Sequence, residues 1–192
     1  MFSDELEAWL KSPGKKTLGQ LNDIFGEKTF AVALLLLLFL PALPIPTGGI
    51  SHATELIAML ISLEMIIGMQ SVWLPHALLH KSLSNSTKDK ALPFISKRIR
   101  WFEKYSKPRL TGLLANRLFR SFLGFCTLAF CLGAFFAPPF SGLDTLPSMG
   151  VVVLSLGIIL EDIYVLAAGI GIGITGIAIN IGLGSAILQL FR

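Results

Sequence analysis

Polar side chains interrupt the long apolar stretches of this sequence, and their types are those that bind ions and ligands inside membranes. His52 and Glu55 stand three positions apart, so one face of a helix carries both. An ionisable group at membrane depth is costly, so it normally faces protein or water and marks a site or a path. The candidate ligand-binding residues are Ser51, His52, Glu55, Glu64, Ser141 and Asp144.

Plainer interpretations of these residues stay open. His52, Glu55 and Asp144 would be solvated if they lay at the tips of two hairpins, at the far membrane surface. Asp144 precedes Thr145, and both are of types that cap a helix. Glu64 has only uncharged neighbours, so we expect it to be buried, paired or protonated. It stands nine positions after Glu55, so on a straight helix the two carboxylates lie on opposite sides.

The polar residues follow two breaks in apolar runs, and the two breaks are similar. An ungapped offset of 93 positions aligns the run Phe30–Leu40 and its break with the run Phe122–Phe136 and its break, and it places Ser51 opposite Asp144. The break residues are Pro44, Pro46, Gly48 and Gly49 in the first half and Pro138, Pro139 and Gly142 in the second. Paired breaks of this kind place irregular backbone inside the bilayer, where its N–H and C=O groups can bind a phosphate or a cation.

Composition supports a membrane protein. The chain has 192 residues, of which 53% are apolar and only 15% are charged. Residues 29–51, 121–143 and 163–191 carry no charge, and each is long enough to cross a bilayer as a helix. The polar first 28 residues lack the apolar core of a cleavable signal, so we expect the chain to stay in the membrane as made. Gly169 and Gly173 have the spacing of closely packed membrane helices.

The pattern predicts an all-α integral membrane protein with two similar halves, each an apolar helix, a Pro/Gly break and a return helix. The predicted parts are 1–28, an amphipathic cytoplasmic segment; 29–70, the first membrane repeat; 71–118, a basic cytoplasmic or interfacial linker; 119–162, the second membrane repeat; and 163–192, a glycine-rich transmembrane helix. The second return leg, 148–160, is short for a full span, which favours a re-entrant or tilted helix. Whether the halves are parallel or inverted stays open.

The charge distribution predicts the orientation. Residues 70–120 hold eleven lysines and arginines but only two acids, so the positive-inside rule places them in the cytoplasm. From Pro93 onward, apolar and basic residues alternate at helical spacing, which predicts an amphipathic helix that attracts anionic headgroups. The candidate lipid contacts are Lys97, Arg98, Arg100, Arg117 and Arg120. Nucleic acid also binds basic patches, but so apolar a chain argues against it.

Other residue types offer weaker chemistry. Cys126 and Cys131 stand five apart in an apolar run, which suits neither a metal pair nor a local disulfide, so we expect buried inert thiols. His76 and His80 have the spacing of two metal ligands, but no third ligand stands nearby, and we predict no metal site. We also predict no cofactor. The sequence shows no phosphate-binding loop, nucleophile elbow or zincin motif, so an enzyme is unsupported.

Several short motifs occur in a set order along the chain. They are Phe25-Gly26-Glu27, the run Leu40–Pro46 with Gly48-Gly49, Trp73-Leu74-Pro75, the run Pro138–Gly142, and Leu160-Glu161-Asp162. This order resembles the ExoD family of bacterial membrane proteins, named for exopolysaccharide synthesis. The resemblance implies an inner-membrane protein with a role in making, exporting or regulating surface polysaccharide, and no set of catalytic residues. The chain departs from the family at Gln70-Ser71-Val72, where members commonly have arginines, and at Ile163-Tyr164, where members often have a glycine.

Two functions are therefore expected. The resemblance implies a non-enzymatic membrane factor in exopolysaccharide production, which would handle an anionic lipid or a lipid-linked sugar at its paired breaks. The residues would also suit a small-solute or ion transporter with Glu64, Asp144 and His52 as coupling groups. For both we expect membrane lipids as partners, and also a homodimer, because paired copies would bury more of the irregular backbone.

Overall fold

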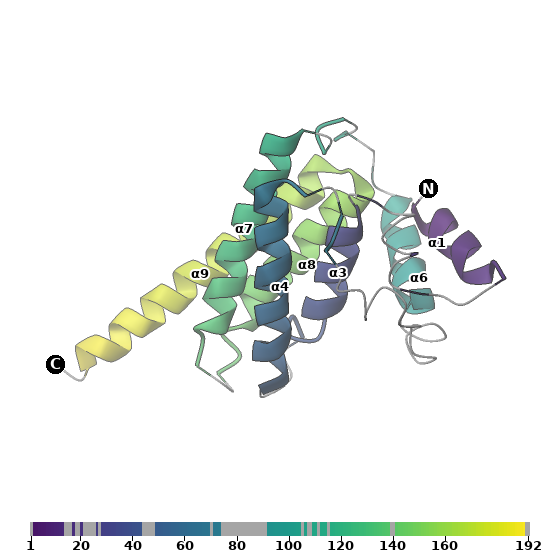
Figure 1. Cartoon of the computed structure of the whole chain (residues 1–192). Helices are drawn as coiled ribbons and strands as arrows, with labels where there is room; N and C mark the ends of the chain where they lie inside the picture. The colour runs from purple at the N-terminus through teal and green to yellow at the C-terminus, as the bar shows by residue number, and fades with distance from the viewer. Residues whose placement is uncertain are drawn as a thin grey trace.

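The computed structural model describes residues 2–13, 17, 20, 26, 28–43, 49–69, 71–73, 92–104, 106, 109–110, 112–114, 116–138 and 141–190. The elements in these ranges are helices (Figure 1). They are α1 (Phe2–Lys11), α3 (Lys28–Leu38), α4 (Gly49–Ile67), α6 (Leu92–Glu103), α7 (Arg117–Phe135), α8 (Thr145–Leu160) and α9 (Ile163–Leu190). The expected all-α class is confirmed for this part of the chain.

Four of these helices, α3, α4, α7 and α8, form an antiparallel bundle (Figure 1). The Ser121 hydroxyl donates a 2.7 Å hydrogen bond to the Ile66 carbonyl, so α7 begins where α4 ends. The ring of His52 lies 5.5 Å from that of Phe135, so α4 begins where α7 ends. We call the end of the bundle where α4 ends and α7 begins the linker end; it also holds Lys28, Arg117 and Glu161. We call the opposite end, where α4 begins and α7 ends, the break end; it also holds Asp144.

The helices α3 and α8 are paired in the same way. The Lys28 ammonium at the start of α3 lies 2.7 Å from the Glu161 carboxylate, just after the end of α8. As a result α3 and α7 run in one direction, α4 and α8 run in the other, and the segments that follow α3 and α7 both lie at the break end. With 11 residues, α3 measures about 17 Å at helical rise, too short to cross a bilayer core of about 30 Å.

The predicted break residues belong to these break-end segments. Pro44, Pro46, Gly48 and Pro139 lie outside the described residues. Gly49 is the first residue of α4, and Pro138 is exposed just after α7. Gly142 has φ 71°, a left-handed conformation that favours glycine. The second return helix begins at Thr145 rather than at residue 148, so it is longer than the sequence predicted.

Glycines line the contact between α8 and α9. A Cβ atom on Gly150 would lie 2.5 Å from the Gly173 Cα, and one on Gly157 would lie 2.5 Å from the Leu166 nitrogen. The two backbones therefore touch where larger residues would separate them, as the spacing of Gly169 and Gly173 predicted. Beyond this contact α9 extends away from the bundle (Figure 1).

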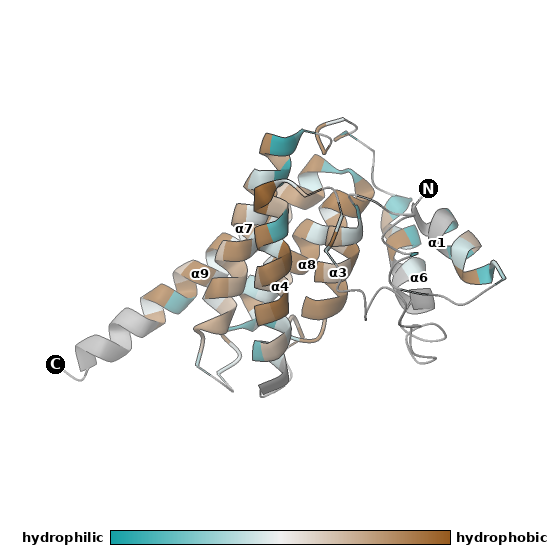
Figure 2. Cartoon of the chain, viewed as in Figure 1, coloured by the Kyte–Doolittle hydropathy of each residue, from teal (hydrophilic) through white to brown (hydrophobic). Residues whose placement is uncertain are grey.

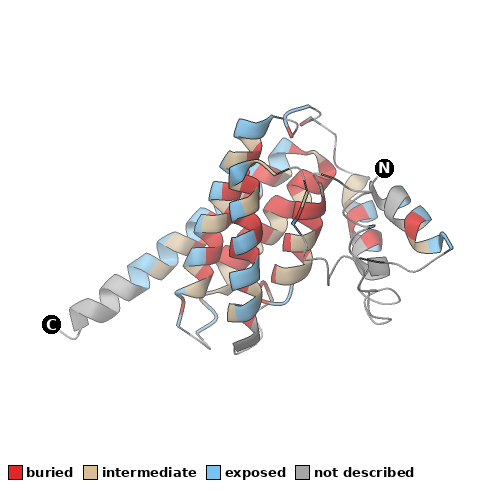
Figure 3. Ribbon diagram, in the orientation of Figure 1, coloured by how far each residue is buried: buried red, intermediate tan, exposed pale blue. Residues whose placement is uncertain are grey.

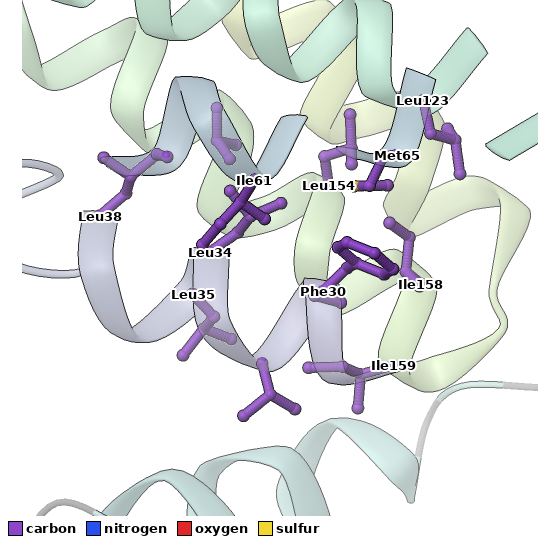
Figure 4. Packing of buried hydrophobic residues seen from close by; sticks show 14 of the residues in the cluster. Phe30, Leu34, Leu35, Leu38, Ile61, Met65, Leu123, Leu154, Ile158 and Ile159 are labelled. Atoms are coloured by element: carbon purple, nitrogen blue, oxygen red, sulfur yellow. The ribbon is translucent and has the colours of Figure 1, made fainter. Parts of the chain in front are cut away.

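Apolar side chains from all four helices fill the bundle interior (Figure 4). Phe30 of α3, Met65 of α4, Leu123 of α7 and Ile158 of α8 are buried members of this cluster. Burial of such side chains drives helix association in water and gives close packing in lipid. This packing sets the relative positions of the four helices at the break end.

The outer faces of the helices are apolar as well. Large apolar side chains are exposed on α4, α7 and α9: Leu60, Leu63, Ile67, Leu118, Phe122, Phe125, Ile174 and Ile181. Figures 2 and 3 show these helices hydrophobic on surfaces that the protein leaves uncovered. By length and composition, α7 and the Ile163–Leu183 part of α9 could each cross a membrane.

The basic helix predicted from Pro93 onward is α6, and it packs against α1. The Arg100 guanidinium lies 2.6 Å from the Glu7 carboxylate, which also accepts a 3.2 Å hydrogen bond from the Ser96 hydroxyl. Trp9 of α1 and Ile99 of α6 are buried. The two helices thus form a unit with ionic and apolar contacts, on the opposite side of the bundle from α9 (Figure 1).

Glu161 and Asp162 join the linker to the bundle. The Glu161 carbonyl accepts hydrogen bonds from the backbone N–H groups of Arg109 at 2.8 Å and Leu110 at 2.9 Å. The Asp162 carboxylate accepts a 2.9 Å hydrogen bond from the Ser106 hydroxyl. The two acids therefore hold the α8–α9 turn against the chain that leads into α7.

Candidate functional site

Glu55 lies on the inward face of α4. Its relative exposure is 0%, and neither carboxylate oxygen has a hydrogen-bond partner in the described part of the chain. The helical period explains this position: Ser51, Ala58 and Ser62, one or two turns away, are also buried, whereas the neighbouring Leu56 is exposed. The amphipathicity of α4 is thus reversed, with an acid inside and leucines outside.

Asp144 lies at the same end of the bundle, at the position preceding α8. Its carboxylate is within the range of direct electrostatic interaction with Glu55. Although Asp144 occupies the N-cap position, its side chain makes no capping hydrogen bond, so the capping interpretation does not account for it. Two like charges in a poorly solvated site repel each other, and this arrangement favours a bound positive charge.

His52 is the third ionisable residue of the break end. Its ring lies 5.5 Å from the Phe135 ring, and its Nδ1 is buried without a hydrogen-bond partner in the described part of the chain. One turn of α4 separates His52 from Glu55. The break end therefore carries two acids and one imidazole, and the buried polar atoms of Glu55 and His52 lack hydrogen-bond partners among the described residues.

Polar residues continue inward from Glu55 along the contact of α4 with α7. Cys131 lies within electrostatic range of Glu55 and forms a side-chain hydrogen bond with Ser62. The Ser62 hydroxyl donates a 2.7 Å hydrogen bond to the Ala58 carbonyl. Cys131 is buried, as the sequence predicted, but it contacts polar groups and not only apolar ones.

Two serines of α8 are buried, and the search of the sequence for site residues missed them. Ser148 is 1% exposed and Ser155 is 0% exposed, and both hydroxyls lack a partner in the described part of the chain. The offset of 93 positions aligns Ser148 with Glu55 and Ser155 with Ser62. The alignment at this offset could therefore have pointed to both serines, but serines do not stand out among apolar residues as acids do.

Ser51 and Ser141, the two predicted hydroxyl groups, lie in different surroundings. Ser51 is buried at the start of α4. Ser141 is exposed, and its hydroxyl donates a 2.6 Å hydrogen bond to the Pro138 carbonyl and accepts a 3.2 Å hydrogen bond from the Leu143 N–H. These bonds close the turn between α7 and α8, so Ser141 shapes the break end.

Glu64 lies at the linker end, away from the other candidates. Its carboxylate accepts a 2.8 Å hydrogen bond from the backbone N–H of Trp73, and its side chain is half-buried. Glu64 is therefore paired, as one of the expectations had it, but with a backbone group. Its position on α4 separates it from Glu55 and Asp144.

The predicted lipid contacts differ in their surroundings. Lys97 is exposed, and Arg100 is exposed but paired with Glu7, while the side chain of Arg98 lies outside the described residues. Arg117 donates a 2.9 Å hydrogen bond to the Ile67 carbonyl, which joins α7 to the end of α4. Arg120 is 7% exposed and lies within the protein rather than on its surface.

Two electrostatic features complete the description. The Arg100 guanidinium, through a hydrogen bond, holds the pKa of Glu7 below its usual range. In the described part of the chain no group of three His, Cys, Asp or Glu side chains could hold a metal ion. His76 and His80 lie outside the described residues.

Comparison with known proteins identifies relatives of the chain. The sequence model of a family described as exopolysaccharide synthesis, ExoD, matches residues 2–182. The chain belongs to the ExoD family. Protein ExoD of Rhizobium meliloti is 32% identical to it over 165 residues, which are 80% of this chain and 64% of that protein. An uncharacterized protein of Synechocystis sp. is 27% identical over 155 residues, which are 79% of this chain and 71% of that protein.

No solved structure matches this ExoD chain. The ExoD match extends from α1 into α9, so it includes both the linker contacts of Asp162 and the break-end acids. Membership thus confirms the resemblance seen in the order of motifs, and it connects the chain to exopolysaccharide synthesis.

Proposed function

We propose that this ExoD protein is an integral protein of the bacterial inner membrane that supports exopolysaccharide production without catalysing a reaction. The family name supports the connection with exopolysaccharide. The observation that supports the rest of the proposal is the burial of the Glu55 carboxylate, which has no hydrogen-bond partner among the described residues and lies inside a bundle whose outer faces are apolar. Membrane proteins retain such acids where they act on an ion or a substrate.

The distribution of side chains supports insertion into a bilayer. Large apolar residues are exposed on α4, α7 and α9, whereas Glu55, Thr127 and Ser155 are fully buried. Exposed apolar area of this extent on a soluble protein would promote aggregation, but in lipid it has no such cost. Because α3 is short, we propose that this helix by itself spans only part of the bilayer core.

The proposed orientation places the linker end in the cytoplasm. Arg109 and Arg117 lie at this end, and α6 adds further basic residues, which agrees with the positive-inside rule. The exposed Lys97 and Lys104 would attract an anionic lipid or the phosphate of a lipid-linked sugar. The break end, with Glu55 and Asp144, then faces the periplasm.

A second candidate function is transport of an ion or of a small solute. The proximity of Asp144 to Glu55 favours it, because two neighbouring acids attract a cation and not a phosphate. Of the coupling groups expected from the sequence, Asp144 and His52 remain with Glu55, whereas Glu64 is at the other end. The two functions are compatible if a cation drives a step of polymer export.

A complementation experiment tests the proposed function. Secreted and cell-associated polysaccharide is measured in a strain that lacks the gene and is complemented at matched protein levels. We expect wild type to restore the polymer, and the double variant Lys97→Gln/Lys104→Gln to restore less. Lys11→Gln, which removes an exposed lysine from α1, is the control and should restore it fully. Polymer unchanged by the deletion would contradict the proposal.

A further inference from the structure

Glu55 has no described partner that could compensate an ionised carboxylate. Both of its oxygens are buried without a hydrogen bond, and the charged side chain of the described residues that acts on it electrostatically is Asp144, which is also acidic. An unpaired buried charge is unstable, so such a group binds a proton or a cation. We propose that Glu55 is the inner residue of a site for one small monovalent cation, and that this cation exchanges through Asp144 and His52 at the break end.

The groups around Glu55 define the site. Its own helix contributes His52, the start of α8 contributes Asp144, and α7 contributes Cys131. The remaining helix, α3, carries no ionisable side chain beyond Lys28, which pairs with Glu161 at the linker end. The site therefore has two acids and one imidazole, and among the described residues no lysine or arginine acts on Glu55.

The packing limits the size of the ligand. Because Glu55 is 0% exposed, a ligand that reaches it without moving the helices must be small, as H⁺ and Na⁺ are. A further oxygen atom stands one turn after Asp144 on α8: the buried hydroxyl of Ser148 is without a partner in the described residues, and hydroxyl oxygens bind both ions. The ligands of Zn²⁺ or Cu²⁺ are not assembled here, since no group of three suitable side chains occurs among the described residues.

The positions of the three ionisable groups suggest the path of exchange. Asp144 and His52 are half-buried at the break end, whereas Glu55 is enclosed. A proton from water would reach Asp144 or the imidazole first and pass from there to Glu55, which becomes a neutral carboxylic acid. Its release by the same path restores the carboxylate. This inference deepens the proposed function, on which its membrane setting rests.

Infrared spectroscopy of the purified protein in lipid nanodiscs tests this inference. The signal of a protonated carboxylic acid is recorded against pH, without sodium and with sodium chloride. We expect a signal in wild type and in Glu64→Gln that is absent from Glu55→Gln. If the ion is H⁺ alone, sodium does not change the signal; if Na⁺ binds too, sodium removes it at constant pH and releases one proton per chain. A signal unchanged by Glu55→Gln would overturn the inference.

Asp144→Asn provides a second variant in case Glu55→Gln fails to fold. Because it removes the neighbouring negative charge but leaves Glu55 in place, it should shift the pH at which the signal is lost. An unchanged pH would mean that Asp144 takes no part. These readouts do not involve polysaccharide, so failure here is distinct from failure of the proposed function, which the deletion strain tests.

Discussion

The backbone N–H of Trp73 donates a 2.8 Å hydrogen bond to the carboxylate of Glu64, whereas Glu55, on the same helix, accepts none from the described residues. This difference separates two acids that look alike in the sequence. Glu64 holds the segment that follows α4 at the linker end through its bond to Trp73, and Glu55 lies inside the bundle at the break end. Glu64 therefore has a structural role, and Glu55 is the acid that we propose binds a ligand.

The role of Glu64 gives the first prediction. Glu64→Gln keeps an oxygen that can accept the Trp73 N–H, so its stability should be close to that of wild type. Glu64→Leu removes the acceptor and should lower the free energy of unfolding by about 1–3 kcal/mol. Thermal unfolding in detergent measures both. Equal melting temperatures for Glu64→Leu and wild type would show that the hydrogen bond contributes nothing.

The contact of α8 with α9 gives a second prediction. Gly150→Ala places a methyl group where the Gly173 Cα already lies, so α9 must move away, and we expect destabilisation of about 1–3 kcal/mol. Gly171→Ala is the matched control, because a Cβ on Gly171 meets nothing within 4 Å. Comparing the melting temperatures of the two variants shows whether the α8–α9 contact requires a glycine at position 150. Equal effects would contradict backbone-to-backbone packing.

The contact of α1 with α6 should depend on pH. Because Arg100 lowers the pKa of Glu7, the carboxylate stabilises the contact fully above its ordinary pKa, and this contribution disappears as the pH falls through the lowered value. Hydrogen exchange of α1 amides should therefore accelerate on acidification. In Glu7→Gln the exchange should be faster already at neutral pH and change less with acid. A variant with the pH response of wild type would refute this assignment.

The turn between α8 and α9 gives a fourth prediction. Asp162→Ala removes the acceptor of the Ser106 hydroxyl and of the Tyr164 N–H, so it should destabilise the protein by about 1–3 kcal/mol. Lys28→Gln breaks only the partly exposed pair with Glu161, and it should cost at most about 1 kcal/mol. Thermal unfolding distinguishes them. A larger effect of Lys28→Gln would mean that the salt bridge, rather than Asp162, holds this turn.

Local patterns in the sequence predicted several elements well. The uncharged run after Asp162 corresponds to α9, and the basic amphipathic pattern after Pro93 corresponds to α6. The glycine spacing predicted a close contact in α9 because it depends only on the size of the residue. These features follow from neighbouring residues, which is why the sequence alone reveals them.

Features that depend on tertiary contacts were not predictable in this way. Glu64 finds its partner at Trp73 after the chain turns, and Arg120 is buried although its charge suggested a surface position. The burial of Ser148 depends on which face of α8 meets the bundle. The sequence selected Glu55 and Asp144 as candidates, but only the fold shows that they lie close enough to interact.

The most direct test of the central claim is to measure exopolysaccharide in a deletion strain. The strain is complemented, at matched protein levels, with Glu55→Gln or with Glu64→Gln. The two variants make the same chemical change on the same helix, so they differ only in the position of the acid. We predict that Glu64→Gln restores the polymer and that Glu55→Gln does not. Full restoration by Glu55→Gln would contradict the claim that the buried acid at the break end carries the function.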